Sequence, residues 1–258
     1  MGWGLRRAAV IAAAVPAALV AVLGVEAYLT ATAEYLPGDP GYVVEATVEP
    51  EGVPADAEPL RLVVLGDSTV AGVGSPTAAD SVAVLVADRV AQELDRPVTV
   101  VGHGVSGART ATVLTEQVSL LDTARADVVL LVIGSNDVTH VTRPGDLRRQ
   151  TEALIRAARE ASGAPVVLGG IPQFRTVPAL AQPLRWVVGR YAVPLREVQR
   201  SVAAELDAPF VDIAALASPR FVGLPESMSS DGFHPSPLGY GFWADALAPA
   251  VADAVRND

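Results

Sequence analysis

The sequence predicts a three-layer α/β/α sandwich built on a five-stranded parallel sheet. Five short apolar runs are rich in valine and do not alternate with polar residues, which is typical of strands buried on both faces. These runs are 62–65, 98–101, 128–133, 165–168 and 210–213. Helical patterns separate the runs, so strand and helix alternate along the chain. With right-handed crossovers, this alternation places helices on both faces of the sheet.

The first of these helices is expected between the first two runs. Apolar residues recur there at helical spacing from Val82 to Leu94. Asp80 or Ser81 precedes them as a candidate N-cap, and Pro97 follows as a stop signal. The sequence therefore predicts a helix of about three turns that packs on the sheet.

Two further helices are predicted, and one segment stays open. Apolar spacing over 147–158 predicts a helix, with Gly163 placed for its C-terminal cap. Residues 238–255 form the predicted last helix. The segment 171–200 is the least regular, with aromatic residues and four prolines. It is either surface loop and helix packing, or a wall or lid of a substrate site.

Residues 1–33 are predicted to be a membrane anchor or a signal peptide. Arg6 and Arg7 precede eighteen residues without a charge, 8–25. This length is at the lower edge for a membrane-spanning helix and above that of most signal-peptide cores. Ala31-Thr32-Ala33 resembles a small-x-small cleavage site, so a cleaved signal stays an alternative. Either version leaves the arginines inside and exports the rest, which predicts an extracytoplasmic domain at the cell membrane, or secretion.

Residues 34–60 are predicted to be an acidic linker that contains prolines and glycines. They hold seven acidic residues and no basic ones, without helical or strand periodicity. We expect an extended tether between the membrane segment and a domain over 61–258.

The composition excludes several classes of function. The chain has no cysteine, which excludes disulfides, thiolate catalysis and cysteine-ligated metals. The net charge of −10 argues against nucleic-acid binding, because that function needs a basic face to neutralise phosphates.

Chemistry-bearing residues follow several of the predicted strands. Parallel strands present their carboxyl ends at one edge of the sheet, and ligands bind beyond that edge. Four segments are expected to meet there: Gly66-Asp67-Ser68, 102–107, Gly134-Ser135-Asn136-Asp137, and the loop 230–235 before the last helix. The sequence therefore predicts a single site assembled from these loops.

The residues of these loops fit nucleophilic catalysis. A serine hydroxyl reacts only when a base takes its proton, and His234 is the candidate base for Ser68. Asp231 is placed to orient the imidazole and to stabilise its charged form. The oxyanion formed from an ester carbonyl needs preorganised donors. The backbone N–H groups of Ser68 and Gly104 and the side-chain amide of Asn136 are the predicted donors.

These blocks resemble the SGNH hydrolases, also called the GDSL esterase/lipase family. That family is named for a serine, a glycine, an asparagine and a histidine, here Ser68, Gly104, Asn136 and His234. The resemblance covers the chain from about residue 62 to its C-terminus. It implies a flavodoxin-like sheet and the hydrolysis of small-molecule, lipid or glycan esters or thioesters without a metal or other cofactor. The second block departs from the common Asn-x-Gly, because Gly102 stands in place of the asparagine.

Three alternatives stay open beside an exported or membrane-tethered serine esterase that acts through an acyl-enzyme. The same residues would serve an acyltransferase that passes the acyl group to sugars or lipids of the cell envelope. A binding module on a catalytically dead hydrolase fold is a second alternative. The third is a zinc hydrolase that uses His103, His140 and His234, although no pair of them has helical spacing. Outside that alternative, no metal site is predicted, and His140 is expected at the rim.

Overall fold

The parallel sheet that the sequence predicted is present, with one additional strand. The computed structural model describes residues 2–54 and 56–257, and side chains from residue 16 onward within those ranges. The strands are β1 (Val44–Val48), β2 (Leu60–Gly66), β3 (Val98–Gly104), β4 (Val128–Val132), β5 (Val166–Gly169) and β6 (Phe210–Val211). Their order is β1-β3-β2-β4-β5-β6, and all neighbours except β1 and β3 are parallel.

Each of the five predicted runs overlaps one of the parallel strands, although β6 takes up only the first two residues of the run 210–213. Every residue of β4 and β5 is buried, because helices cover both faces of the sheet. The order β3-β2-β4-β5-β6 places the second parallel strand beside the first and the others on its far side. This is the flavodoxin-like order, and the point where it reverses lies between β2 and β4.

The additional strand corrects the prediction of a structureless linker over 34–60. β1 pairs antiparallel with β3, with Val44 opposite Gly102 and Val48 opposite Val98. Val44 is buried, whereas Glu45 is exposed, so the strand alternates as an edge strand with one covered face does. Because Glu45 lies on its open face within an acidic segment, this short alternation was not recognised as a strand in the sequence.

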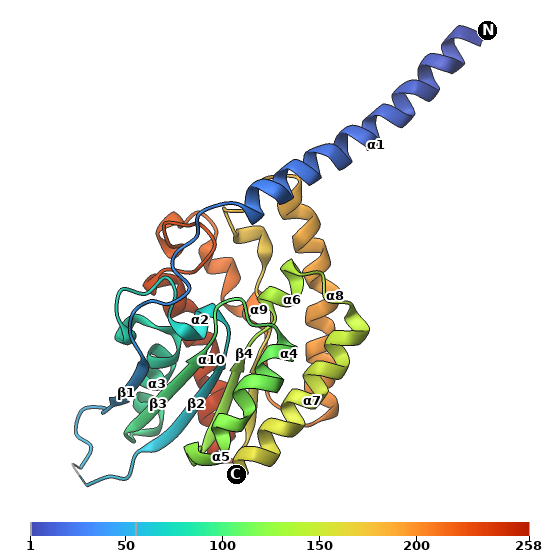
Figure 1. Cartoon of the computed structure of the whole chain (residues 1–258). Coiled ribbons are helices and arrows are strands. Elements are labelled where there is room, and N and C mark those ends of the chain that lie inside the picture. The colour runs from blue at the N-terminus through green and yellow to red at the C-terminus, as the bar shows by residue number, and fades with distance from the viewer. Residues whose placement is uncertain (1, 55, 258) are drawn as a thin grey trace.

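Four long helices complete the two outer layers (Figure 1). One face carries α3 (Val82–Leu94) and α10 (Pro237–Arg256), which pack against each other. The other face carries α7 (Pro144–Ser162) and α8 (Leu184–Glu205). Shorter helices connect them: α2 (Ser68–Ala71), α4 (Thr110–Thr112), α5 (Leu121–Ala124), α6 (Ser135–Thr139) and α9 (Ile213–Leu216).

The predicted helix ends agree with the structure. Ser81 caps α3, and its side chain accepts a hydrogen bond from the N–H of Val84. Gly163 ends α7 with φ 69°, a left-handed conformation that glycine adopts without strain. The undecided segment 171–200 divides into a loop with a helical turn at Phe174–Thr176 and most of α8.

The N-terminal helix α1 (Gly2–Ala31) projects away from the domain, and only its C-terminal end lies beside α8 (Figure 1). Much of the predicted anchor stretch 8–25 falls among residues whose side chains are not described. Within the described part of the chain, no helix is long and apolar enough to cross a membrane.

Candidate active site

The carboxyl end of β2 leads directly into α2, and Ser68 is the first residue of that helix. Gly66 makes this turn possible, because a Cβ at this position would lie 2.2 Å from the carbonyl oxygen of Val132 on β4. Asp67 caps the helix: its Oδ1 accepts from the N–H of Thr69 at 3.0 Å and from its hydroxyl at 2.8 Å. Asp67 thus shapes the turn.

Ser68, His234 and Asp231 form a hydrogen-bonded chain. The Nε2 atom of His234 lies 3.0 Å from the Oγ atom of Ser68, and its Nδ1 atom lies 2.7 Å from Oδ2 of Asp231. A carboxylate only accepts hydrogen bonds, so Nδ1 carries the proton and Nε2 is free to accept from the serine hydroxyl. Ser68 and His234 are both 7% exposed. This is the geometry that proton transfer from serine to histidine requires.

The loop of Asp231 holds its carboxylate through local contacts. Oδ1 accepts hydrogen bonds from the N–H groups of Phe233 at 2.9 Å and His234 at 3.0 Å. Burial raises the pKa of Asp231, but the hydrogen bonds from His234 and from the two backbone groups outweigh it, so the pKa lies below its ordinary value. Asp231 is therefore an ionised partner for His234.

Asn136 lies in the first turn of α6, the second short helix of the site. Its Nδ2 atom donates to the carbonyl oxygen of Ala108 at 3.0 Å, which fixes the orientation of the amide. A second N–H remains on the same nitrogen. The following residue, Asp137, is fully buried and accepts from the N–H and hydroxyl of Thr110 at 2.9 and 2.8 Å. Asp137 therefore joins α6 to α4.

Gly107, and not Gly104, lines the cavity at Ser68. Gly107 lines the same cavity as Ser68 and Asn136, with φ 80°. Gly104 lies within β3, where a Cβ would be 2.0 Å from the N of Ala71 and 2.6 Å from the carbonyl oxygen of Asp67. Gly104 thus permits close packing of α2 on β3. The sequence analysis predicted that the N–H of Gly104 is an oxyanion donor. The position of Gly104 within β3 gives this residue a packing role instead.

Two backbone donors near Ser68 have no partner among the described residues. Neither the N–H of Ser68 nor that of Gly107 donates a hydrogen bond within that part of the chain. Together with the amide of Asn136, three donors thus border one cavity. The signal that could have identified Gly107 is its place in a Ser-Gly turn directly after β3.

The sequence analysis missed two buried glutamines that hold the strand ends. Gln117 accepts from the N–H of Gly66 at 3.0 Å and donates to its carbonyl oxygen at 2.8 Å. Gln199 bridges the backbone of Ile171 and Ile133 in the same manner, at 3.0 and 2.9 Å. In the sequence, each role was indicated only by a single glutamine at a position of a helical pattern where an apolar residue is expected.

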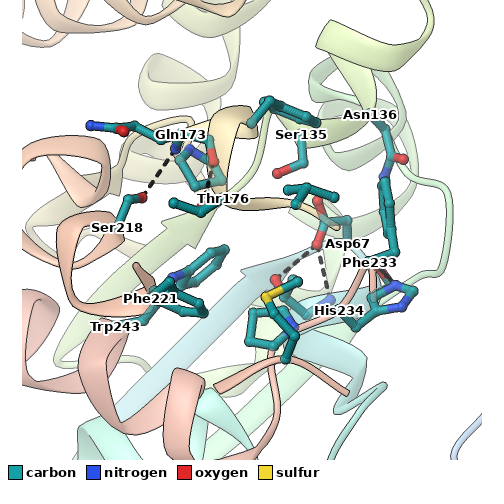
Figure 2. A pocket seen from close by; sticks show the side chains of 17 residues that line it. Asp67, Ser135, Asn136, Gln173, Thr176, Ser218, Phe221, Phe233, His234 and Trp243 are labelled. Carbon is teal, nitrogen blue, oxygen red and sulfur yellow. Dashed lines mark hydrogen bonds between the residues drawn. The ribbon is translucent and has the colours of Figure 1, made fainter. Parts of the chain in front are cut away.

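Two cavities meet at Ser68 and His234. The smaller, of about 50 Å³, is lined by polar and apolar side chains, and the apolar ones include Phe174, Phe221, Met228 and Trp243. Figure 2 shows Phe221 and Trp243 on one side of it and Asn136, Phe233 and His234 on the other. The segment 171–200 contributes to this wall through Phe174. Of the two alternatives that the sequence left open for this segment, the position of Phe174 favours the wall of a site.

The larger cavity, of about 510 Å³, also includes His234 and extends from it toward α1. It is bordered by residues from α1, α6, α8 and the loops of Gly107 and Phe233. His140 lines it, and its Nδ1 lies 2.9 Å from the carbonyl oxygen of Asn136. This agrees with the rim position expected for His140.

The zinc alternative lacks a cluster of ligands. Among the described residues, no three histidine, aspartate or glutamate side chains are placed to hold one metal ion. His103 lies on β3, where burial lowers its pKa against the opposing effect of Glu45. His103 does not line either cavity at Ser68.

Sequence comparisons point to ester-hydrolysing proteins. A model of the GDSL-like Lipase/Acylhydrolase family matches residues 64–242. The chain is 29% identical over 200 residues to a GDSL-like esterase of Mycobacterium tuberculosis, covering 77% of this chain and 63% of that protein. It is 28% identical over 188 residues to an arylesterase of Vibrio mimicus, covering 73% of this chain and 86% of that protein. The match therefore spans less than two thirds of the mycobacterial relative.

Solved structures share the fold. The crystal structure of TesA superimposes with a TM-score of 0.61 at 25% identity, over 75% of this chain and 99% of that one. Axe2, an acetylxylan esterase from Geobacillus stearothermophilus, gives a TM-score of 0.59 over 76% of this chain and 95% of its own. At 19% identity, the second likeness concerns the fold alone.

Proposed function

The chain belongs to the GDSL-like lipase/acylhydrolase family, and from this premise we propose that it is a serine esterase that cleaves carboxylic esters through an acyl-enzyme. The observation that carries the proposal is the hydrogen-bonded chain from Ser68 through His234 to Asp231. It opens onto cavities on both sides, so an ester carbonyl has access to the serine hydroxyl.

In the first half of the reaction, Oγ of Ser68 attacks the carbonyl carbon while Nε2 of His234 takes the hydroxyl proton. Asp231 stabilises the imidazolium that results. When the tetrahedral intermediate collapses, the bond to the alcohol oxygen breaks, and His234 returns the proton to that oxygen. The products of this half are a free alcohol and an ester between the acyl group and Ser68.

In the second half, water takes the place of the alcohol. His234 accepts a proton from the water, the hydroxyl oxygen attacks the acyl carbon, and the bond to Oγ breaks. The proton passes to Oγ, which restores Ser68 and releases a carboxylic acid. No step needs a redox partner or a Lewis acid.

The oxyanion of both intermediates is stabilised by the N–H groups of Ser68 and Gly107 and by Nδ2 of Asn136. The assignment of Gly107, in place of Gly104, is supported by its position on the cavity and by its free N–H. Donors fixed before the reaction stabilise developing charge without reorganisation, which is why such groups contribute strongly to rate.

For location, we propose that the N-terminal segment directs the catalytic domain out of the cytoplasm. The proposal is supported by Arg6 and Arg7 ahead of the charge-free stretch 8–25. Protease added to intact cells should then digest the domain. Digestion only after lysis would contradict export.

A serine-directed fluorophosphonate tests the proposed mechanism on the full chain. It should label the protein once, at Ser68, because only this hydroxyl combines a histidine base with free oxyanion donors. Ser68→Ala should remove both labelling and ester hydrolysis. Ser135→Ala is the matched control, because Ser135 borders the small cavity without a histidine partner among the described residues. Labelling of folded protein at another serine would contradict the assignment.

The same preparation distinguishes the zinc alternative. EDTA should leave hydrolysis unchanged, since the proposed steps use side chains and water alone. A loss of activity that added zinc restores would favour a metal mechanism.

A further inference from the structure

We infer that the C-terminal end of α1 and the segment after it form one wall of the substrate cavity and receive the larger apolar part of the ester. The wall consists of the residues of this part of the chain that line the cavity: Ala27, Thr30, Ala31, Tyr35 and Leu36. The inference rests on the proposed esterase function and extends it to the class of substrate. It assigns a role in binding to a segment that the sequence predicted to be only an anchor and a tether.

One face of α1 forms the helical part of the wall. Ala27, Thr30 and Ala31 follow the i, i+3, i+4 spacing that places side chains side by side, and all three line the larger cavity. Leu184 and Val188 of α8 line the same cavity. The α1 side chains are small, so their size helps to set how much of the cavity stays open.

Contacts at the helical end fix α1 to the domain. Oε2 of Glu26 accepts a hydrogen bond from the N–H of Leu184 at 2.8 Å. Leu184 is the first residue of α8, and its N-cap residue, Pro183, provides no side-chain hydrogen bond. A carboxylate is favoured at this end of a helix, where unpaired N–H groups concentrate positive charge. Glu26, which lies on α1, therefore caps the N-terminus of α8.

Contacts after the helix fix the segment to the catalytic loop. The ring of Tyr35 packs edge-on against Phe233, with centroids 5.3 Å apart, and Phe233 packs in turn against His234 at 5.2 Å. The N–H of Leu36 donates to Oδ2 of Asp231 at 3.3 Å, the same oxygen that pairs with His234. The wall is thus attached at both ends to elements that border Ser68.

The two cavities differ in what they can hold. The volume of about 50 Å³ on one side of Ser68 holds only a small group, whereas about 510 Å³ are available on the side of α1. Because both cavities include Ser68, an ester bound there has room for one half in each of them. The geometry therefore fits esters that join a small group to a bulky apolar one, with the bulky half against α1 and α8.

The inferred wall also distinguishes between the two predictions for the N-terminal segment, a retained anchor and a cleaved signal peptide. Cleavage after Ala33 would remove Glu26, Ala27 and Ala31, and with them the cap of α8 and the wall. The inference therefore requires that the active enzyme keeps α1. Intact-mass analysis of active protein should find an N-terminus before Glu26, and a fully active form that starts at Glu34 would overturn the inference.

Substitution in the full chain tests the wall directly. Ala31→Trp places a large ring at the cavity. Ala33→Trp is the matched control, because Ala33 is exposed like Ala31 but does not line the cavity. Two substrate series share methyl acetate as their smallest member: methyl esters of longer acids, and acetates of longer alcohols. Acid release measures kcat/KM for each.

Relative to methyl acetate, Ala31→Trp should lower kcat/KM for the longest members of one series by about tenfold or more, as steric exclusion from an apolar pocket does. The affected series identifies which half of the ester faces α1. Ala33→Trp should follow the wild type. Ala27→Leu, a smaller addition on the same face, repeats the test if the tryptophan variant does not fold. The wall is refuted if folded variants keep the wild-type length profile in both series.

That failure is distinct from a failure of the proposed function. If the esterase proposal itself were wrong, the wild type would hydrolyse neither series and the fluorophosphonate would not label Ser68. A wild type that is labelled and active, with variants of unchanged profile, would overturn only the role of α1.

Discussion

The Nδ1 atom of His234 lies 2.7 Å from Oδ2 of Asp231, which is only three residues earlier in the chain. The pair is formed within one loop, so its geometry depends little on how distant elements pack. The bond to Ser68 is different, because 166 positions separate its partners and the whole sheet must form before they meet.

The pair of His234 and Asp231 predicts the effect of Asp231→Asn. The amide no longer fixes the tautomer with the proton on Nδ1, and kcat should fall by about 10⁴-fold, as in the serine protease triad. KM should change little. Steady-state kinetics on a soluble ester measure both, and a kcat within a few fold of wild type would contradict the role of Asp231.

Asp231 also predicts a contribution to stability that depends on pH. Its pKa is lowered in the folded protein, so its stabilisation is complete above the ordinary aspartate pKa and is lost as the pH falls through the lowered value. Urea unfolding of wild type and Asp231→Asn across acidic pH should therefore show their difference shrinking as the pH falls. A difference that grows toward low pH would have the wrong sign.

Asn136→Ala removes one oxyanion donor and leaves Ser68 and His234 in place. Loss of such a donor typically costs about 2.7–4 kcal/mol, or roughly a hundred- to a thousandfold in kcat. The effect should fall on kcat more than on KM, because the bond is strongest in the transition state. Labelling by the fluorophosphonate should slow but continue. Unchanged turnover in a folded variant would make Asn136 a turn residue only.

Gly104 and Gly107 can be separated by adding one methyl group to each. Gly104→Ala places a Cβ 2.0 Å from the N of Ala71, so α2 must move and labelling of Ser68 should be lost. Gly107→Ala meets no atom within 4 Å and keeps the N–H, although its φ of 80° adds about 1–2 kcal/mol of strain. Thermal unfolding and labelling rates measure both variants. A folded Gly104→Ala variant that is labelled at the wild-type rate would argue against the packing role of Gly104.

Gln117→Leu tests the support beneath the nucleophile. The N–H of Gly66 would lose its partner in a buried place, and the free energy of unfolding should fall by about 1–3 kcal/mol. Gln92→Leu is the control, since Gln92 is exposed and bonds only the side chain of Asp88. Urea unfolding measures both. Equal small losses would mean that Gln117 contributes no more than a surface glutamine.

The local sequence determined much of this protein. Short continuous apolar runs such as 128–133 are typical of inner strands, and helical spacing with caps at Ser81 and Gly163 fixed the ends of α3 and α7. The loop of Asp231 and His234 was likewise predictable, because its hydrogen bonds join neighbours in the chain.

Tertiary packing decided the rest. Which glycine borders the cavity at Ser68 depends on how α2 packs on β3, and the pairing of β1 depends on a partner fifty or more residues away. The wall formed by α1 depends on Glu26 meeting Leu184 and Leu36 meeting Asp231, which are 158 and 195 positions apart. Sequence periodicity reports which face of an element is buried. It carries no information on which distant element covers that face, because any apolar surface of fitting shape satisfies the same pattern.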